Sequence, residues 1–190
     1  MTPADSAAAP IKSAIQPVSM RGYDTDFDAF SQALGGSFKR YGFAVISDHG
    51  LDEGVIDRAI TDAKAFFALP EEVKRQYHQP GTGGARGLTP FGVEAAKGAA
   101  TVDLKEFWHT GRELPEGHAL RKYMRDNVWP TEIAGFRQDV YGMFEALDAL
   151  GRKLLKAIAH YLSLDDDFFE DKVQLGNSVL RLLHYPPVPA

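Results

Sequence analysis

Six histidines are the side chains best suited to bind a metal ion here, because the sequence contains no cysteine. A non-haem iron site needs two histidines and one carboxylate, and many such sites begin with a His-x-Asp or His-x-Glu pair. The sequence contains no His-Glu-x-x-His motif, in which two histidines one helical turn apart bind zinc. The residues two positions after the six histidines are all non-acidic: Leu51, Pro80, Gly111, Leu120, Leu162 and Pro186. The sequence therefore predicts no local metal motif.

Taken singly, the histidines have structural interpretations. His49 lies in the turn-like segment 47–50, where we expect it to bond to the backbone. His160 lies near the carboxyl end of a predicted helix, where the helix dipole favours a cation. His109 and His184 fall in predicted strands and could line a cavity. Metal ligation is the less favoured interpretation for both.

Two other catalytic patterns are also missing. Residues 79–90 are rich in glycine and proline, which predicts a surface loop. The segment contains neither of the glycine motifs that cradle phosphates, G-x-x-x-x-G-K-[ST] and G-x-G-x-x-G. The chain also lacks the G-x-S-x-G nucleophile elbow. The sequence thus argues against phosphate transfer and serine hydrolysis.

The composition is that of an ordinary folded domain, with 190 residues, 44% hydrophobic and 25% charged. A net charge of -5 argues against nucleic acid as the main partner, since phosphate binding needs a basic face. Residues 1–13 lack the pattern of a signal peptide, and no apolar run approaches the roughly 20 residues of a membrane span. We therefore expect a cytoplasmic protein that binds neither nucleic acid nor membranes.

Helices and short strands must position these residues. A first helix is expected to have Thr25 as its N-cap, to bury Phe30, Leu34 and Phe38 and to end at Gly42. A short buried strand should follow over 43–46. A second helix over 55–67 and a third opened by Pro70 come next, followed by a weak strand over 103–110.

The strongest periodicity lies between Pro130 and Leu162, where apolar residues recur at steps of three or four. It predicts one long amphipathic helix. Residues 165–171 predict a short acidic helix or turn, and Val179–Tyr185 alternates as a strand. The expected fold class is therefore α+β.

The order of these segments resembles the amino-terminal region of the isopenicillin N synthase-like oxygenases, which are non-haem iron enzymes mostly dependent on 2-oxoglutarate. The composition of the first residues predicts a flexible amino terminus over 1–15. The resemblance covers 16–190 and implies one domain there, with a helical region and the first strands of an incomplete double-stranded β-helix (jelly-roll). It is carried by Gly42-Phe43, Ser47-Asp48-His49-Gly50, Phe66–Lys74, Arg86-Gly87, Asp103–Phe107, Asn127–Pro130 and Leu180–Pro187.

The family's iron ligands follow the Tyr-Pro-Pro segment, whereas this sequence stops at Ala190. The resemblance therefore implies that Fe(II) and 2-oxoglutarate belong to a complete enzyme that oxidises a small organic substrate by hydroxylation, desaturation or ring closure. We expect the 190-residue chain alone to lack catalytic and metal-binding residues, to bind no cofactor tightly and to be inactive. The alternative is a naturally short, non-catalytic binding protein built on the same half-fold, whose open strand edges would need a partner.

Four residues carry over from the resemblance. Tyr185 resembles a tyrosine that contacts the cosubstrate in some relatives. Arg181 occupies a position that is often basic in the family, on the same face as Leu183 and Tyr185. We expect both to bind the cosubstrate, with packing and charge pairing alone as the alternative. Arg86 and Phe91 lie in a segment that approaches the mouth of the family's active site, where they would contact substrate. For Asp103, Lys105 and Glu106 we expect only a charged strand edge with structural ion pairs.

Overall fold

The structure is a computed structural model that describes residues 15–95, 98 and 101–187. Its chain divides into two compact units. Unit 1 contains the chain up to Gly50 together with Ala157–Asp166, and unit 2 contains Leu51–Lys156 and the chain from Asp167 onward. The flexible terminus expected over 1–15 lies almost wholly outside the described residues. The single domain expected over 16–190 stays a prediction.

Unit 1 is built on a helix that ends where the sequence predicts. Gly42 has the left-handed φ of 80° that favours glycine, and it terminates the helix. The two strands of unit 1 pair in parallel. Its elements before Gly50 are β1 (Val18–Ser19), α1 (Arg21–Thr25), α2 (Phe27–Tyr41) and β2 (Ile46–Ser47).

Three expectations for unit 1 were wrong. Thr25 ends α1, its hydroxyl donating to the carbonyl of Arg21, and Asp26 caps α2 instead by accepting from the Ala29 amide at 3.0 Å. Phe38, expected in the core, is 42% exposed. The segment 43–46 is not a buried strand, because Phe43 and Val45 are nearly half exposed and pairing starts only at Ile46.

Unit 2 contains a longer succession of elements. The long helix begins at Phe136 rather than near Pro130, because Gly135 holds a left-handed φ of 91° that a helix cannot include. Its carboxyl-terminal residues from Ala157 to Tyr161 belong to unit 1. The elements are α3 (Glu53–Phe67), α4 (Glu71–Lys74), η1 (Arg75–Tyr77), β3 (Gly87–Thr89), β4 (Glu106–Gly111), η2 (Ala119–Lys122), α5 (Phe136–Tyr161), α6 (Glu170–Val173) and β5 (Val179–His184).

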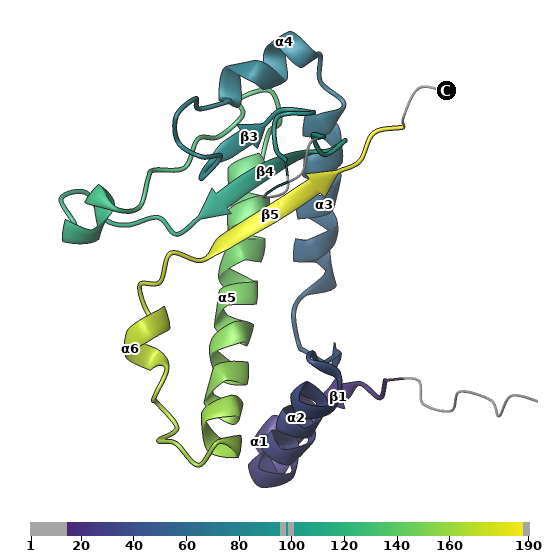
Figure 1. Ribbon diagram of the computed structural model, residues 1–190, viewed down its shortest axis with the longest axis vertical. Helices are drawn as coiled ribbons and strands as arrows, with labels where there is room; N and C mark the ends of the chain where they lie inside the picture. The colour runs from purple at the N-terminus through teal and green to yellow at the C-terminus, as the bar shows by residue number, and fades with distance from the viewer. Residues whose placement is uncertain (1–14, 96–97, 99–100, 188–190) are drawn as a thin grey trace, which may run out of the picture. The chain divides into compact units, whose positions relative to one another are not determined.

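The sheet of unit 2 has the order β3-β4-β5, and both pairs are antiparallel. The loop expected over 79–90 was therefore partly wrong, since Gly87–Thr89 pairs with β4. Helices α3 and α5 cover one face of the sheet (Figure 1), where Phe66, Trp108 and Phe136 form an aromatic core. No helix over the described residues has both the length and the apolar character that a bilayer crossing requires.

Candidate functional site on the open face of the sheet

Strand β5 turns alternate side chains toward opposite faces of the sheet. Leu180 and Leu182 pack against the core. Arg181, Leu183 and Tyr185 alternate with them, and their exposed fractions are 40%, 47% and 66%. Among the described residues, no strand pairs with the outer edge of β5. The two residues predicted to bind a cosubstrate, Arg181 and Tyr185, therefore belong to one open surface, although their role remains a prediction.

The guanidinium of Arg181 is held from three sides. Its Nε donates to Nε2 of His109, which lies directly opposite on β4. Its central carbon lies 4.4 Å from the centre of the Phe107 ring. Its Nη1 lies 3.7 Å from a carboxylate oxygen of Glu94. Arg181 is thus fixed at its inner side while part of the group stays in solvent.

His109 is a buried, neutral link in this arrangement. Its Nδ1 contacts the Gly84 carbonyl oxygen, which can only accept a hydrogen bond, so Nδ1 carries the proton. Its Nε2 accepts from Arg181 and must be unprotonated. Burial lowers the pKa of His109, and the positive charges of Arg181 and Arg86 lower it further, against opposing effects of the Gly84 carbonyl and Glu94.

A second set of charges holds the segment that leads into β4. Lys105 pairs with Asp103 at 2.6 Å and with Glu94 at 2.8 Å. These two carboxylates raise the pKa of Lys105 to about 12. The structural ion pairs expected over 103–106 are present here, and Glu94 connects them to Arg181.

Glu106 differs from the charged strand edge that the sequence suggests, because only 2% of it is exposed. Both of its oxygens lie 2.8 Å from Nζ of Lys74, which is also buried. His184 contacts the same carboxylate at 2.8 Å and stacks on Phe67. This cluster lies among the core-facing residues of the sheet. Sequence reasoning missed it because α4 and β4 are far apart along the chain.

The two predicted substrate contacts lie in different surroundings. Arg86 is 1% exposed, and its guanidinium donates to the side-chain oxygen of Asn177 and the Ala85 carbonyl. Its Nε is buried without a hydrogen-bond partner, and burial lowers the pKa of the group. Phe91 is 38% exposed. Among the described residues, neither Arg86 nor Phe91 is in direct contact with Arg181. Their role in substrate binding stays a prediction.

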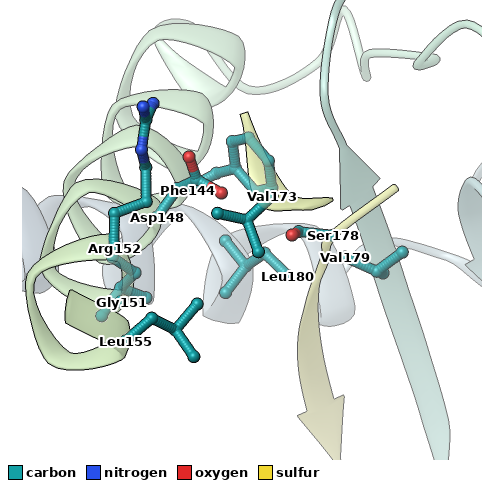
Figure 2. A pocket seen from close by; sticks show the side chains of 10 residues that line it. Phe144, Asp148, Gly151, Arg152, Leu155, Val173, Ser178, Val179 and Leu180 are labelled. Carbon is teal, nitrogen blue, oxygen red and sulfur yellow. The ribbon is translucent and has the colours of Figure 1, made fainter. Parts of the chain in front are cut away.

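A cavity of about 260 Å³ lies between α5, α6 and the start of β5 (Figure 2). Phe144, Leu155 and Leu180 give it an apolar lining. The charged groups at its rim are already paired, Asp148 with Arg112 at 2.7 Å and Arg152 with Glu170. The remaining polar side chain in the lining is the hydroxyl of Ser178, which carries no charge. We therefore assign the candidate site to the open face of the sheet instead.

The sequence predicts no local metal motif among its histidines and carboxylates. Over the residues that the structure describes, no three histidine, aspartate or glutamate side chains come together in a way that could hold a metal ion. His109 uses both ring nitrogens on protein partners. The described part of the chain does not fit an iron centre.

Comparison with known proteins gives these features a family context. A family model described as "non-haem dioxygenase in morphine synthesis N-terminal" matches residues 15–132. A proline hydroxylase of Petromyces alliaceus is 36% identical over 85% of this chain and 50% of its own length. A 2-oxoglutarate-dependent dioxygenase of Didymella fabae is 31% identical over 78% of this chain and 48% of its own.

A crystal structure of a 2OG-Fe(II) oxygenase family protein from Caulobacter crescentus is also similar. It is 60% identical with a TM-score of 0.86, over 94% of this chain and 58% of that chain. The chain thus spans about half the length of the curated relatives that it matches. These likenesses support an oxygenase family, and they do not favour the non-catalytic alternative.

Proposed function

This chain belongs to the family of non-haem dioxygenase amino-terminal regions, and from that membership we propose that it is the amino-terminal part of an Fe(II)- and 2-oxoglutarate-dependent oxygenase. The complete enzyme would oxidise a small organic molecule by hydroxylation, desaturation or ring closure. The chain's own contribution is to bind and orient molecules on one sheet face while its helices cover the other.

The observation that carries this proposal is the open face of β5. Over the described residues, β5 packs one face on the core and pairs with no strand at its outer edge. Exposed strand edges normally pair or are covered, so we take this sheet to be incomplete. We propose that further strands would continue from β5 to complete a jelly-roll. Arg181, Leu183 and Tyr185 would then line its interior.

The side chains of Arg181 and Tyr185 are suited to hydrogen-bond one carboxylate group of 2-oxoglutarate. A guanidinium and a phenol both donate hydrogen bonds, and a carboxylate accepts several. When bound beside iron, 2-oxoglutarate supplies the electrons that such enzymes use to activate oxygen. The described residues do not fit the iron itself, so we propose that this chain alone binds Fe(II) only weakly. Arg86 and Phe91 stay proposed contacts to the organic substrate.

A chimera tests this function. The chain would replace the matching amino-terminal part of the Caulobacter crescentus protein, which is 60% identical to it. With Fe(II) and oxygen, we expect the chimera to convert 2-oxoglutarate to succinate, and an Arg181→Leu chimera to need at least about tenfold more cosubstrate, the equivalent of 1.4 kcal/mol. A folded chimera without succinate formation, where the parent protein forms it, would contradict the proposal.

A further inference from the structure

The direction of the Arg181 guanidinium depends on one neutral neighbour. Arginine has five N–H donors in a rigid plane, so fixing one N–H and the plane also fixes where the others point. His109 accepts from Nε, and the Phe107 ring lies against the plane. Glu94 attracts Nη1 from 3.7 Å. Of these three, only His109 forms a direct hydrogen bond at close range.

We propose that His109 is a positioning residue that, as a neutral imidazole, aims the Arg181 guanidinium at the carboxylate of 2-oxoglutarate. The inference rests on the proposed function, because it takes the open face of β5 as the cosubstrate surface. His109 itself is 8% exposed and lies behind Arg181. It acts through Arg181 and not by touching the cosubstrate.

Protonation of His109 would break this arrangement. An imidazolium carries N–H groups on both nitrogens, so its Nε2–H would face the Nε–H of Arg181. The charged groups around His109 are Arg181 from β5, Arg86 from the segment before β3 and Glu94 from the segment after it. Two of these three are cations, and the pKa of His109 is accordingly lowered, with burial as the first cause.

The geometry therefore couples proton uptake to carboxylate binding. Near neutral pH, His109 accepts from Arg181 and the guanidinium is held. As the pH falls through the lowered pKa of His109, the imidazolium repels Arg181 and the guanidinium turns away. Binding of a carboxylate should then weaken in acid by more than the titration of the cosubstrate alone explains.

Two substitutions separate positioning from packing. In His109→Gln, the amide can donate to the Gly84 carbonyl and accept from Arg181, but it does not titrate. In His109→Leu, the acceptor is lost. His184→Gln is the matched control, since His184 is also on this sheet but contacts Glu106 among the core-facing residues.

The experiment uses the chimera described above, in which this chain replaces the amino-terminal part of the Caulobacter crescentus protein. The chimera is labelled with ¹⁵N, and two readouts are followed by NMR as the pH is lowered from 8 to well below the ordinary histidine pKa of about 6.5. One is the Arg181 Nε–H signal and the nitrogen shifts of His109 without ligand. The other is the dissociation constant for added 2-oxoglutarate. We expect the unsubstituted chimera to lose both the hydrogen-bonded chemical shift of the Arg181 Nε–H and its affinity for 2-oxoglutarate in acid, and the Gln variant to keep both.

The Leu variant should bind about tenfold more weakly at neutral pH, which corresponds to 1.4 kcal/mol. The control should bind like the unsubstituted chimera. If 2-oxoglutarate binds and the Gln variant shows the same acid loss as the unsubstituted chimera, the positioning role is wrong. If the His109–Arg181 signals behave as expected but 2-oxoglutarate does not bind, the proposed cosubstrate surface is wrong instead.

Discussion

Asp62 on α3 is a carboxylate placed beside another carboxylate, Asp139 on α5. One Asp62 oxygen, Oδ2, is buried without a hydrogen-bond partner. Asp139 is paired with Arg58 at 3.0 Å and so has a partner that favours its charged form. Burial raises the pKa of Asp62, and the neighbouring Asp139 raises it further. The charged form of Asp62 is therefore unfavourable in the folded protein.

This arrangement makes a pH-dependent prediction for Asp62→Asn. A raised folded pKa means that Asp62 favours folding at low pH and that this benefit is lost as pH rises through that pKa. At pH 7 an amide can donate to Asp139, so we expect a gain of about 0.5–1 kcal/mol in unfolding free energy, typical of one hydrogen bond. Urea unfolding would measure the gain, which should shrink toward pH 3.5, a value chosen just below the ordinary aspartate pKa of about 3.9.

The control is Asp57→Asn, an exposed position on the same helix. It should change stability little at either pH. An Asp62→Asn protein that is less stable than wild type at pH 7 would contradict the assigned repulsion.

At the scale of elements, α2 contacts the end of α5 within unit 1 through a glycine. A Cβ atom on Gly35 would come within 2.1 Å of the Tyr161 ring, whereas a Cβ on the adjacent Gly36 would meet nothing within 4 Å. The hydroxyl of Ser31 adds a buried hydrogen bond of 2.6 Å to the Ala157 carbonyl. Gly35 is therefore required for close approach, and Gly36 is not.

Alanine at these two positions should have opposite effects. Gly35→Ala should destabilise the protein by about 1–3 kcal/mol, as overpacking of a core commonly does. Gly36→Ala should stabilise it by about 0.5–1 kcal/mol, because alanine is the better helix former. Thermal unfolding of both variants measures this. Equal effects of the two substitutions would show that the Tyr161 contact is not the cause.

The ion pair of Lys74 and Glu106 connects α4 to β4. Glu106→Leu leaves the buried Lys74 cation with Glu71 as its one charged partner among the described residues, at 3.4 Å and partly exposed. We expect a loss of about 3 kcal/mol in denaturant unfolding, at the low end for breaking a buried pair. The double variant Lys74→Met/Glu106→Leu should recover most of that loss, because no charge is then left buried. Additive losses would contradict this.

Much of the element order could be predicted from the sequence, for physical reasons that differ between elements. The apolar periodicity of α5 and the alternation of β5 follow from burying one face, so they are visible in the residues themselves. Strand β3 was not predicted, because the glycine-rich segment 79–90 has the local pattern of a loop. Its residues Gly87–Thr89 form a strand through their pairing with β4. Thr25 and Asp26 are both good helix caps, and sequence alone could not choose between them.

At the scale of the whole molecule, the site was predicted only in part. The alternation of 179–185 correctly indicated that Arg181 and Leu183 share a face with Tyr185. The contact of Arg181 with His109, 72 residues away, depends on the register of β4 and β5. That register is set by tertiary packing, and no local signal in the sequence contains it.

The central claim is that this chain supplies one part of a longer oxygenase, and it spans about half the length of its curated relatives. The most direct measurement is the intact mass of the protein isolated from its natural source. We expect a mass well above 20.9 kDa, the mass of the 190-residue chain, with added sequence that contains two histidines and a carboxylate able to bind iron. A mass of 20.9 kDa would contradict the claim.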